Sequence, residues 1–127
     1  MTTEWFLSAQ AIVRIGASIA TLYASLGEEG IIHGINETEV THIITTQDLL
    51  SKLSKIKSRI PKVNTIIYVE GIKPLTTNGF GPEINLIPFK QLISDGKSAA
   101  ETVTGIEPNE DDTAVILYTS GSTLILI

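Results

Sequence analysis

Strand-like and helix-like segments alternate along this chain, and the alternation constrains the fold more than any other feature. Short runs rich in isoleucine, valine, threonine and tyrosine predict strands, whereas apolar residues at intervals of three or four predict helices. Strands are expected over residues 18–23, 41–45, 64–70 and 113–118, with a shorter extended piece at 85–88. Helices are expected over 2–15, 27–36, 49–60 and 89–93. Such an alternation predicts βαβ units around a parallel sheet, so the expected fold class is α/β.

The first predicted helix has the clearest amphipathic pattern near the start of the chain. Thr2 or Thr3 is suited to cap its N-terminus, and Gly16 is suited to end it. Its apolar stripe consists of Trp5, Phe6, Ala9, Ile12 and Val13. A stripe at this spacing predicts a face that packs into the core, and the alternative is a face that binds a partner.

Two further helices follow sequences that resemble capping boxes. Ser25-Leu26-Gly27-Glu28 precedes the second predicted helix, and Thr45-Thr46-Gln47-Asp48 precedes the third. The third helix also carries five of the nine basic residues, namely Lys52, Lys55, Lys57, Arg59 and Lys62. Two interpretations stay open for this basic cluster: a solvated face that complements the helix dipole, or a contact with an anionic surface.

Composition excludes several classes of function. The net charge of -5, from 14 acids and 9 bases, argues against a nucleic-acid partner. The absence of cysteine excludes disulfides, thiolate catalysis and cysteine-type zinc sites. No secretory signal is apparent, and the longest apolar-looking segment, 9–26, is too polar to span a membrane. The chain is therefore expected to be a soluble fragment with a core of ordinary size.

The last predicted strand leads into a turn of hydroxyl and glycine residues, Thr119, Ser120, Gly121, Ser122 and Thr123. Backbone N–H groups in such a turn can converge on an oxyanion, and the hydroxyls add donors. Hydroxyl and glycine clusters are more often plain turns, and this alternative stays open. Ligands in parallel sheets bind at the carboxyl ends of strands, which strengthens the interpretation as a phosphate-binding turn.

Other candidate motifs are weaker. Gly96-Lys97-Ser98 matches part of a Walker loop, but Gln91 stands where the first glycine belongs and a helix precedes the segment. His33 and His42 lack partners at metal-ligand spacing, and residues 110–112 are interpreted as an acidic loop before the last strand. We therefore assign no catalytic residue and no metal ligand.

Residues 118–123, preceded by Pro108 and by Asp111-Asp112-Thr113-Ala114-Val115-Ile116-Leu117, resemble the phosphate-binding signature of the adenylate-forming (AMP-binding) enzymes. Further blocks resemble the long-chain acyl-CoA synthetases within that superfamily, and look closest to the eukaryotic branch that favours arachidonate. These blocks are Ile19 to Gly30, His33-Gly34-Ile35-Asn36-Glu37-Thr38-Glu39, Ile43-Ile44-Thr45 and Asn64 to Val69.

The resemblance implies a long-chain fatty acid–CoA ligase. Enzymes of this family join a fatty acid to ATP, which gives an acyl-adenylate and pyrophosphate, and coenzyme A then displaces AMP; Mg²⁺ assists the first step. Thr119, Ser120, Gly121, Ser122 and Thr123 would contact the ATP phosphates.

The chain departs from the family pattern after Thr123. The family continues with glycine, a variable residue and Pro-Lys-Gly, where this chain has Leu124-Ile125-Leu126-Ile127. Residues 1–127 are therefore expected to be a partial N-terminal domain, truncated within the phosphate-binding loop at about residue 123 and inactive alone.

The resemblance also implies partners and a location. The full-length enzyme would act on ATP, a long-chain fatty acid and coenzyme A, at the cytosolic face of the endoplasmic reticulum or another intracellular membrane. Its membrane anchor would lie before Met1. Two alternatives stay open: a non-catalytic interaction module that associates with the full-length enzyme, and an unrelated nucleotide-binding α/β domain.

Overall fold

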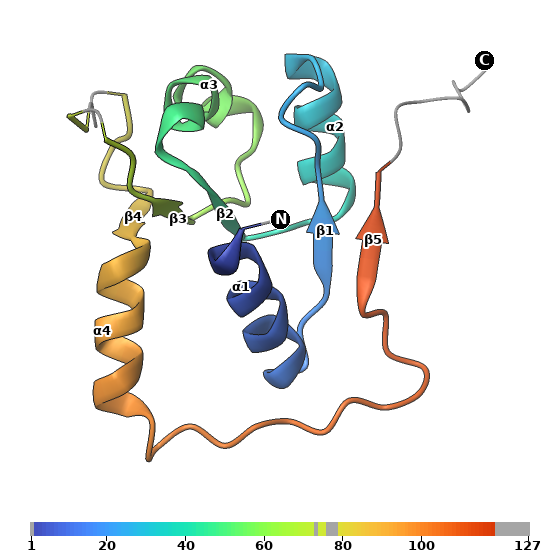
Figure 1. Ribbon diagram of the computed structural model, residues 1–127. Coiled ribbons are helices and arrows are strands. Elements are labelled where there is room, and N and C mark those ends of the chain that lie inside the picture. The colour runs from blue at the N-terminus through green and yellow to red at the C-terminus, as the bar shows by residue number, and fades with distance from the viewer. Residues whose placement is uncertain (1, 73, 76–78, 119–127) are drawn as a thin grey trace. The chain divides into compact units, whose positions relative to one another are not determined.

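A computed structural model describes residues 2–72, 74–75 and 79–118 of the chain (Figure 1). The described residues divide into two compact units. The first unit draws on Met1–Leu26 and Thr104–Ile127, and the second is Gly27–Val103. Each unit contains its own parallel strand pairing, so the predicted α/β class is confirmed, with the strands shared between two open sheets.

The second unit is built on a three-stranded parallel sheet in the order β2-β3-β4. These strands are His42–Thr46, Thr65–Val69 and Asn85–Pro88, so the predicted extended piece at 85–88 is a full sheet member. The register pairs Ile43 with Ile66 and Ile66 with Leu86. The central strand β3 pairs along both of its edges, and its residues Thr65 to Tyr68 are buried on both faces, which explains why its apolar run is continuous in sequence.

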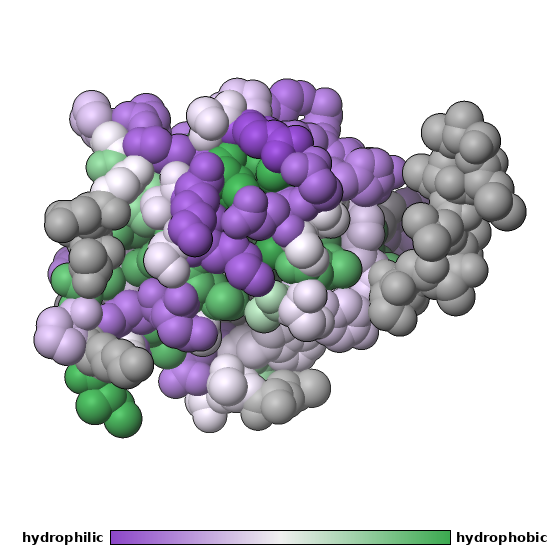
Figure 2. All heavy atoms as spheres, turned by 90° about the horizontal axis from the view of Figure 1, so that it is seen from above, coloured by the Kyte–Doolittle hydropathy of each residue, from purple (hydrophilic) through white to green (hydrophobic). Residues whose placement is uncertain are grey.

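Helix α3 (Leu50–Ile56) connects β2 to β3 and is flanked by the short 3₁₀ turns η1 (Gln47–Leu49) and η2 (Lys57–Arg59). Helix α2 (Glu28–Glu37) precedes β2, and helix α4 (Phe89–Ala99) follows β4. Helix α4 packs on β3 and β4, and α2 packs on α3. Seen from above, most of the molecular surface is hydrophilic, with smaller hydrophobic patches between the polar side chains (Figure 2).

The core of the second unit contains every buried apolar side chain among the described residues. Helices α2 and α3 contribute Ile31, Ile32, Ile35, Leu50, Leu53 and Ile56; β3 contributes Ile66, Ile67 and Tyr68; helix α4 contributes Phe89; and the connections contribute Ile60, Val63 and Ile84. Burial of each aliphatic side chain stabilises the fold by roughly 1.5–3 kcal/mol. The third helix thus turns an apolar face of Leu50, Leu53 and Ile56 into this core.

The first unit contains α1 (Thr3–Arg14) and the parallel pair of β1 (Ile19–Thr21) and β5 (Val115–Leu117). The Thr2 hydroxyl accepts the backbone N–H of Trp5 at 3.3 Å, as expected of an N-cap. Gly16 has a φ of +71°, a left-handed conformation that ends the helix, so both predicted helix signals are confirmed.

The predicted core face of α1 is wrong for the described structure, because no residue of this helix is buried. Trp5 is 46% exposed and Phe6 52% exposed. The described part of the first unit offers one helix and one strand pair, which is too little surface to enclose the stripe. Periodicity identified an apolar face but did not determine what covers it.

Several predicted details of the helices also differ. Helix α2 has Gly27 as its N-cap and η1 has Thr46, and neither makes a side-chain cap hydrogen bond, so both predicted capping boxes are wrong. Helix α4 is longer than the predicted 89–93, because polar residues continue it on an exposed surface. The Gln91 amide there donates to the Asp95 carboxylate at 2.8 Å, one helical turn away. No helix within the described ranges is long and apolar enough to cross a membrane.

Candidate functional site

The predicted phosphate-contacting residues, Thr119, Ser120, Gly121, Ser122 and Thr123, lie outside the described residues. The structure does describe the strand that leads to them, which ends at Leu117 and is followed by Tyr118. It also describes the neighbouring strand β1. The described part of the candidate site is therefore the pair of strands β1 and β5, which precedes the predicted phosphate-contacting residues.

Strands β1 and β5 run parallel in a defined register. Ile19 pairs with Val115, Ala20 with Ile116 and Thr21 with Leu117. The arrowheads of both strands point to the same end of the unit (Figure 1), so their carboxyl ends share one edge. In α/β sheets, this is the edge where ligands bind.

Hydrogen bonds hold the pair at both ends. At the amino end, the Ser18 hydroxyl donates to the carbonyl of Thr113, and the N–H of Ile19 donates to the carbonyl of Ala114 at 2.9 Å. At the carboxyl end, the N–H of Tyr118 donates to the carbonyl of Thr21 at 3.4 Å. The backbone of Tyr118 is therefore held against the end of β1.

The acidic approach to β5 forms a turn. The N–H of Asn109 donates to the Asp112 carboxylate at 2.8 Å, and the N–H of Asp112 donates back to the carbonyl of Asn109 at 3.1 Å. The Asp112 carboxylate thus accepts a hydrogen bond from the backbone of its own loop. Among the residues that the structure describes, no group of three histidine, cysteine or acidic side chains is arranged to hold a metal ion.

The two histidines lie in separate local settings on the second unit. His33 Nε2 lies 3.4 Å from the Glu37 carboxylate on the next turn of α2. His42 Nδ1 lies 2.8 Å from the Thr41 hydroxyl at the start of β2. Both residues are exposed.

The basic cluster of the third predicted helix is largely paired with acidic groups. The Arg59 guanidinium donates to both oxygens of Glu29, at 2.5 and 2.8 Å. Lys57 Nζ lies 3.3 Å from the Glu83 carboxylate, and Lys62 Nζ lies 2.5 Å from that of Glu39.

These pairs change the acidity of the groups involved. The hydrogen bond from Arg59 lowers the pKa of Glu29, and the hydrogen bond from Lys62 lowers the pKa of Glu39. The carboxylate of Glu29 raises the pKa of Arg59 in return. Because three of the cations already face carboxylates, the structure favours a solvated, ion-paired face over a contact with an anionic surface.

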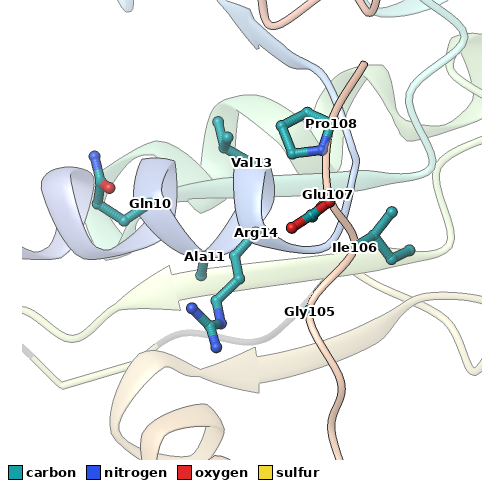
Figure 3. Close-up of a pocket in the computed structure, with 8 residues that line it drawn as sticks. All are labelled: Gln10, Ala11, Val13, Arg14, Gly105, Ile106, Glu107 and Pro108. Carbon is teal, nitrogen blue, oxygen red and sulfur yellow. The ribbon is translucent and has the colours of Figure 1, made fainter.

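A shallow hollow of about 600 Å³ lies in the first unit, beside the C-terminal half of α1 (Figure 3). Its lining consists of Gln10, Ala11, Val13 and Arg14 from the helix and of Gly105, Ile106, Glu107 and Pro108 from the segment before β5. Gln10 and Arg14 point in different directions in Figure 3, so its polar groups do not converge on a ligand. The N–H of Ile106 donates to the carbonyl of Arg14 at 2.9 Å, and the hollow borders this packing contact.

Comparisons with known proteins identify relatives over most of the chain. Residues 1–123 match the family model described as AMP-binding enzyme. Long chain acyl-CoA synthetase 8 of Arabidopsis thaliana is 37% identical over 124 residues, and Long-chain-fatty-acid--CoA ligase 4 of Saccharomyces cerevisiae is 31% identical over 137. Each alignment covers 94% of this chain, but only 17% and 20% of the respective relative. No solved structure matches.

Proposed function

This chain belongs to the AMP-binding enzyme family, and on that premise we propose that it is the part of a long-chain fatty acid–CoA ligase that carries the ATP phosphate-binding loop. The chain spans about a fifth or less of the length of the curated relatives it matches. One observation carries the proposal: the family match runs to residue 123, and the hydroxyl-glycine turn follows a strand whose carboxyl end adjoins that of β1. Parallel strands ending side by side are a recurrent setting for phosphate groups.

In the proposed reaction, a fatty acid carboxylate attacks the α-phosphate of ATP and pyrophosphate leaves. Coenzyme A then attacks the acyl-adenylate as a thiol and AMP leaves, which gives the acyl-CoA thioester. Residues 119–123 would hold the β- and γ-phosphates with hydroxyl and backbone N–H donors, and Mg²⁺ would arrive as part of the metal–nucleotide substrate. Donors aimed at the departing pyrophosphate stabilise the charge that develops on it.

We further propose that the chain has no ligase activity alone. Apolar residues, Leu124-Ile125-Leu126-Ile127, stand where the family resemblance places a second glycine and a lysine. Without a lysine at that position, the loop lacks a cation for the phosphates. The full-length parent is placed at the cytosolic face of an intracellular membrane, on the family resemblance alone.

A graft experiment tests the proposed role. In the Arabidopsis relative, the aligned segment is replaced by residues 1–123 of this chain, and thioester formation is measured with ATP, Mg²⁺, coenzyme A and oleate. The graft is expected to be active, and the purified 127-residue chain is expected to show no turnover. An inactive but folded graft would count against the proposal, and turnover by the chain alone would overturn the predicted inactivity.

A matched pair of glycine variants makes the test specific. Gly121→Asp places a carboxylate in the proposed phosphate loop and is expected to reduce the activity of the graft by about 100-fold or more. Gly96→Asp introduces the same side chain on α4, where a Cβ atom meets nothing within 4 Å, and is expected to leave the activity unchanged. Equal losses in both variants would point to a general folding defect rather than to phosphate binding.

A second candidate function is an interaction module that binds the full-length enzyme. The exposed apolar side chains of α1 and β5 favour it, because Phe6 is 52% exposed and Leu117 70% exposed. Co-purification of a tagged chain with the full-length parent would support this function. If the chain stayed monomeric in the presence of the full-length parent, this result would contradict the function as an interaction module.

A further inference from the structure

Ser58 is an exposed serine among the cations of the third predicted helix. It lies in the middle of the 3₁₀ turn η2, between Lys57 and Arg59, and Lys55 stands three positions before it. Its hydroxyl makes no hydrogen bond to the part of the chain that the structure describes. An accessible hydroxyl with bases on both sides suits an enzyme whose substrate cleft is acidic, because complementary charges guide such a segment into the cleft.

The two other serines of the basic segment 51–62 lack this setting. Ser54 is only partly exposed, and its hydroxyl donates to the carbonyl of Ser51 at 3.0 Å. Ser51 is exposed, but Asp48 stands three positions before it, where Ser58 has Lys55. Charge and accessibility together therefore distinguish Ser58 from its neighbours.

Ser58 also lies between two cations that cross-link the second unit. Arg59 donates to both oxygens of Glu29 on α2, and Lys57 Nζ lies 3.3 Å from the carboxylate of Glu83, in the segment before β4. A phosphate on Ser58 would carry a charge of about -1.5 to -2 and three strong acceptor oxygens. Arginine binds phosphate in the same two-pronged manner as it binds a carboxylate. Because ion pairs between exposed groups are weak, a phosphate on the adjacent residue can displace them.

We propose that Ser58 is a phosphorylation site for a protein kinase that selects basic sequences, and that its phosphate draws Arg59 away from Glu29. The Ser58 oxygen attacks the γ-phosphorus of an ATP molecule bound to the kinase. The bond from that phosphorus to the oxygen shared with the β-phosphate breaks, ADP leaves with the electron pair, and a base of the kinase accepts the hydroxyl proton. Modification of Ser58 thus removes one link between α2 and η2. This inference is independent of the proposed function of residues 119–123.

The first measurement locates the phosphate on the full 127-residue chain. The chain is incubated with ATP, Mg²⁺ and the catalytic fragment of protein kinase C, which selects serines with basic neighbours, and mass spectrometry identifies the modified residue. Phosphate is expected on Ser58, and Ser58→Ala is expected to abolish it, whereas the matched variant Ser51→Ala retains it. Absence of phosphate from Ser58 in the unaltered chain would overturn the site.

A charge reversal tests whether the basic neighbours direct the kinase. Lys55 makes no ion pair within the described ranges, so its replacement leaves the cross-links of Lys57 and Arg59 in place. Lys55→Glu is expected to lower kcat/KM for phosphorylation of Ser58 about tenfold, and Lys55→Arg is expected to keep the rate of the unaltered chain. Equal rates for Lys55→Glu and the unaltered chain would overturn selection by charge, and circular dichroism checks that each variant retains the fold.

The second measurement follows Arg59 by NMR of the chain labelled with ¹⁵N-arginine. Arg14 lies in the other unit and is an internal control, whose signal is expected to stay in place on phosphorylation. In the unmodified chain, Glu29→Gln removes the carboxylate partner of Arg59 and is expected to shift its Nε–H signal. In the phosphorylated chain the same substitution is expected to leave the signal unchanged, because Arg59 then binds the phosphate. A shift of the same size in both forms would overturn the proposed displacement.

Discussion

Removal of the Ile66 side chain beyond its Cβ tests whether β3 is the centre of the second unit. Ile66 is 0% exposed and pairs with Ile43 on one side and with Leu86 on the other. Ile66→Ala deletes three carbon atoms, which at about 0.8 kcal/mol each amounts to roughly 2.4 kcal/mol of lost transfer free energy. A cavity term adds to this, because neighbours on both sides are held by the sheet, so we expect a total loss of about 3–4 kcal/mol.

Ile72→Ala is the matched control, because it deletes the same atoms from a fully exposed side chain in the same unit. We expect it to change the free energy of unfolding by less than about 0.5 kcal/mol. Urea unfolding followed by far-ultraviolet circular dichroism gives both values, and hydrogen exchange of the β3 amides reports the second unit specifically.

The comparison between the two variants can refute the reasoning. A loss of less than about 1 kcal/mol for Ile66→Ala would mean that the site collapses without a cavity, or that β3 is not packed on both sides. Equal losses of unfolding free energy in the two variants would show that burial of the side chain is not the cause of the loss. A loss of about 3 kcal/mol is a large share of the stability of a small domain, so slow exchange at β3 is expected to disappear in the Ile66 variant.

Three further predictions concern single local features. Gly16→Val is expected to destabilise the first unit by about 1–2 kcal/mol or more, because a side chain is strained at positive φ. The new Cβ would also lie 3.2 Å from the Ile106 side chain. Faster hydrogen exchange of the Ile106 amide, which donates to the carbonyl of Arg14, would show this loss. Thr2→Ala removes the cap of α1 and is expected to cost about 1 kcal/mol of helix stability, measured by exchange at the Trp5 amide. Because its partner Arg59 lowers the pKa of Glu29 in the folded chain, the stabilisation from this pair is present above the ordinary pKa of 4.5 and is lost as pH falls below it. The stability of Glu29→Gln is therefore expected to fall less steeply than that of the unaltered chain below that pH, and identical slopes in urea unfolding would contradict it.

The strand at the base of the candidate site was predictable because its signal is local in sequence. A short apolar run identified β5, and the family match to residue 123 agrees with the resemblance to the AMP-binding enzymes. The turn predicted at 119–123 lies outside the described residues and stays a prediction. The partner of β5 was not predictable in this way. Ile19 and Val115 are far apart in the chain, and no local sequence pattern indicates that they pair.

Ion pairs and helix caps illustrate the same limit. The basic residues near Arg59 allowed two interpretations, and the choice depended on Glu29, which lies 30 positions earlier in the chain. The two capping boxes matched a pattern, but the backbone placed each helix start elsewhere. Side-chain caps depend on backbone angles at one residue, and these angles respond to the packing of the whole element.

By itself, the sequence determined which segments form strands and helices, that the strands run parallel, where α1 begins and ends, and which family the chain belongs to. These properties depend on side-chain periodicity and on residues with special backbone preferences. Only the tertiary structure decided that the core lies around β3 rather than under α1, and that Tyr118 is held against Thr21. Burial and strand pairing depend on which distant segments meet, and an apolar stripe looks the same in sequence whether or not another element covers it.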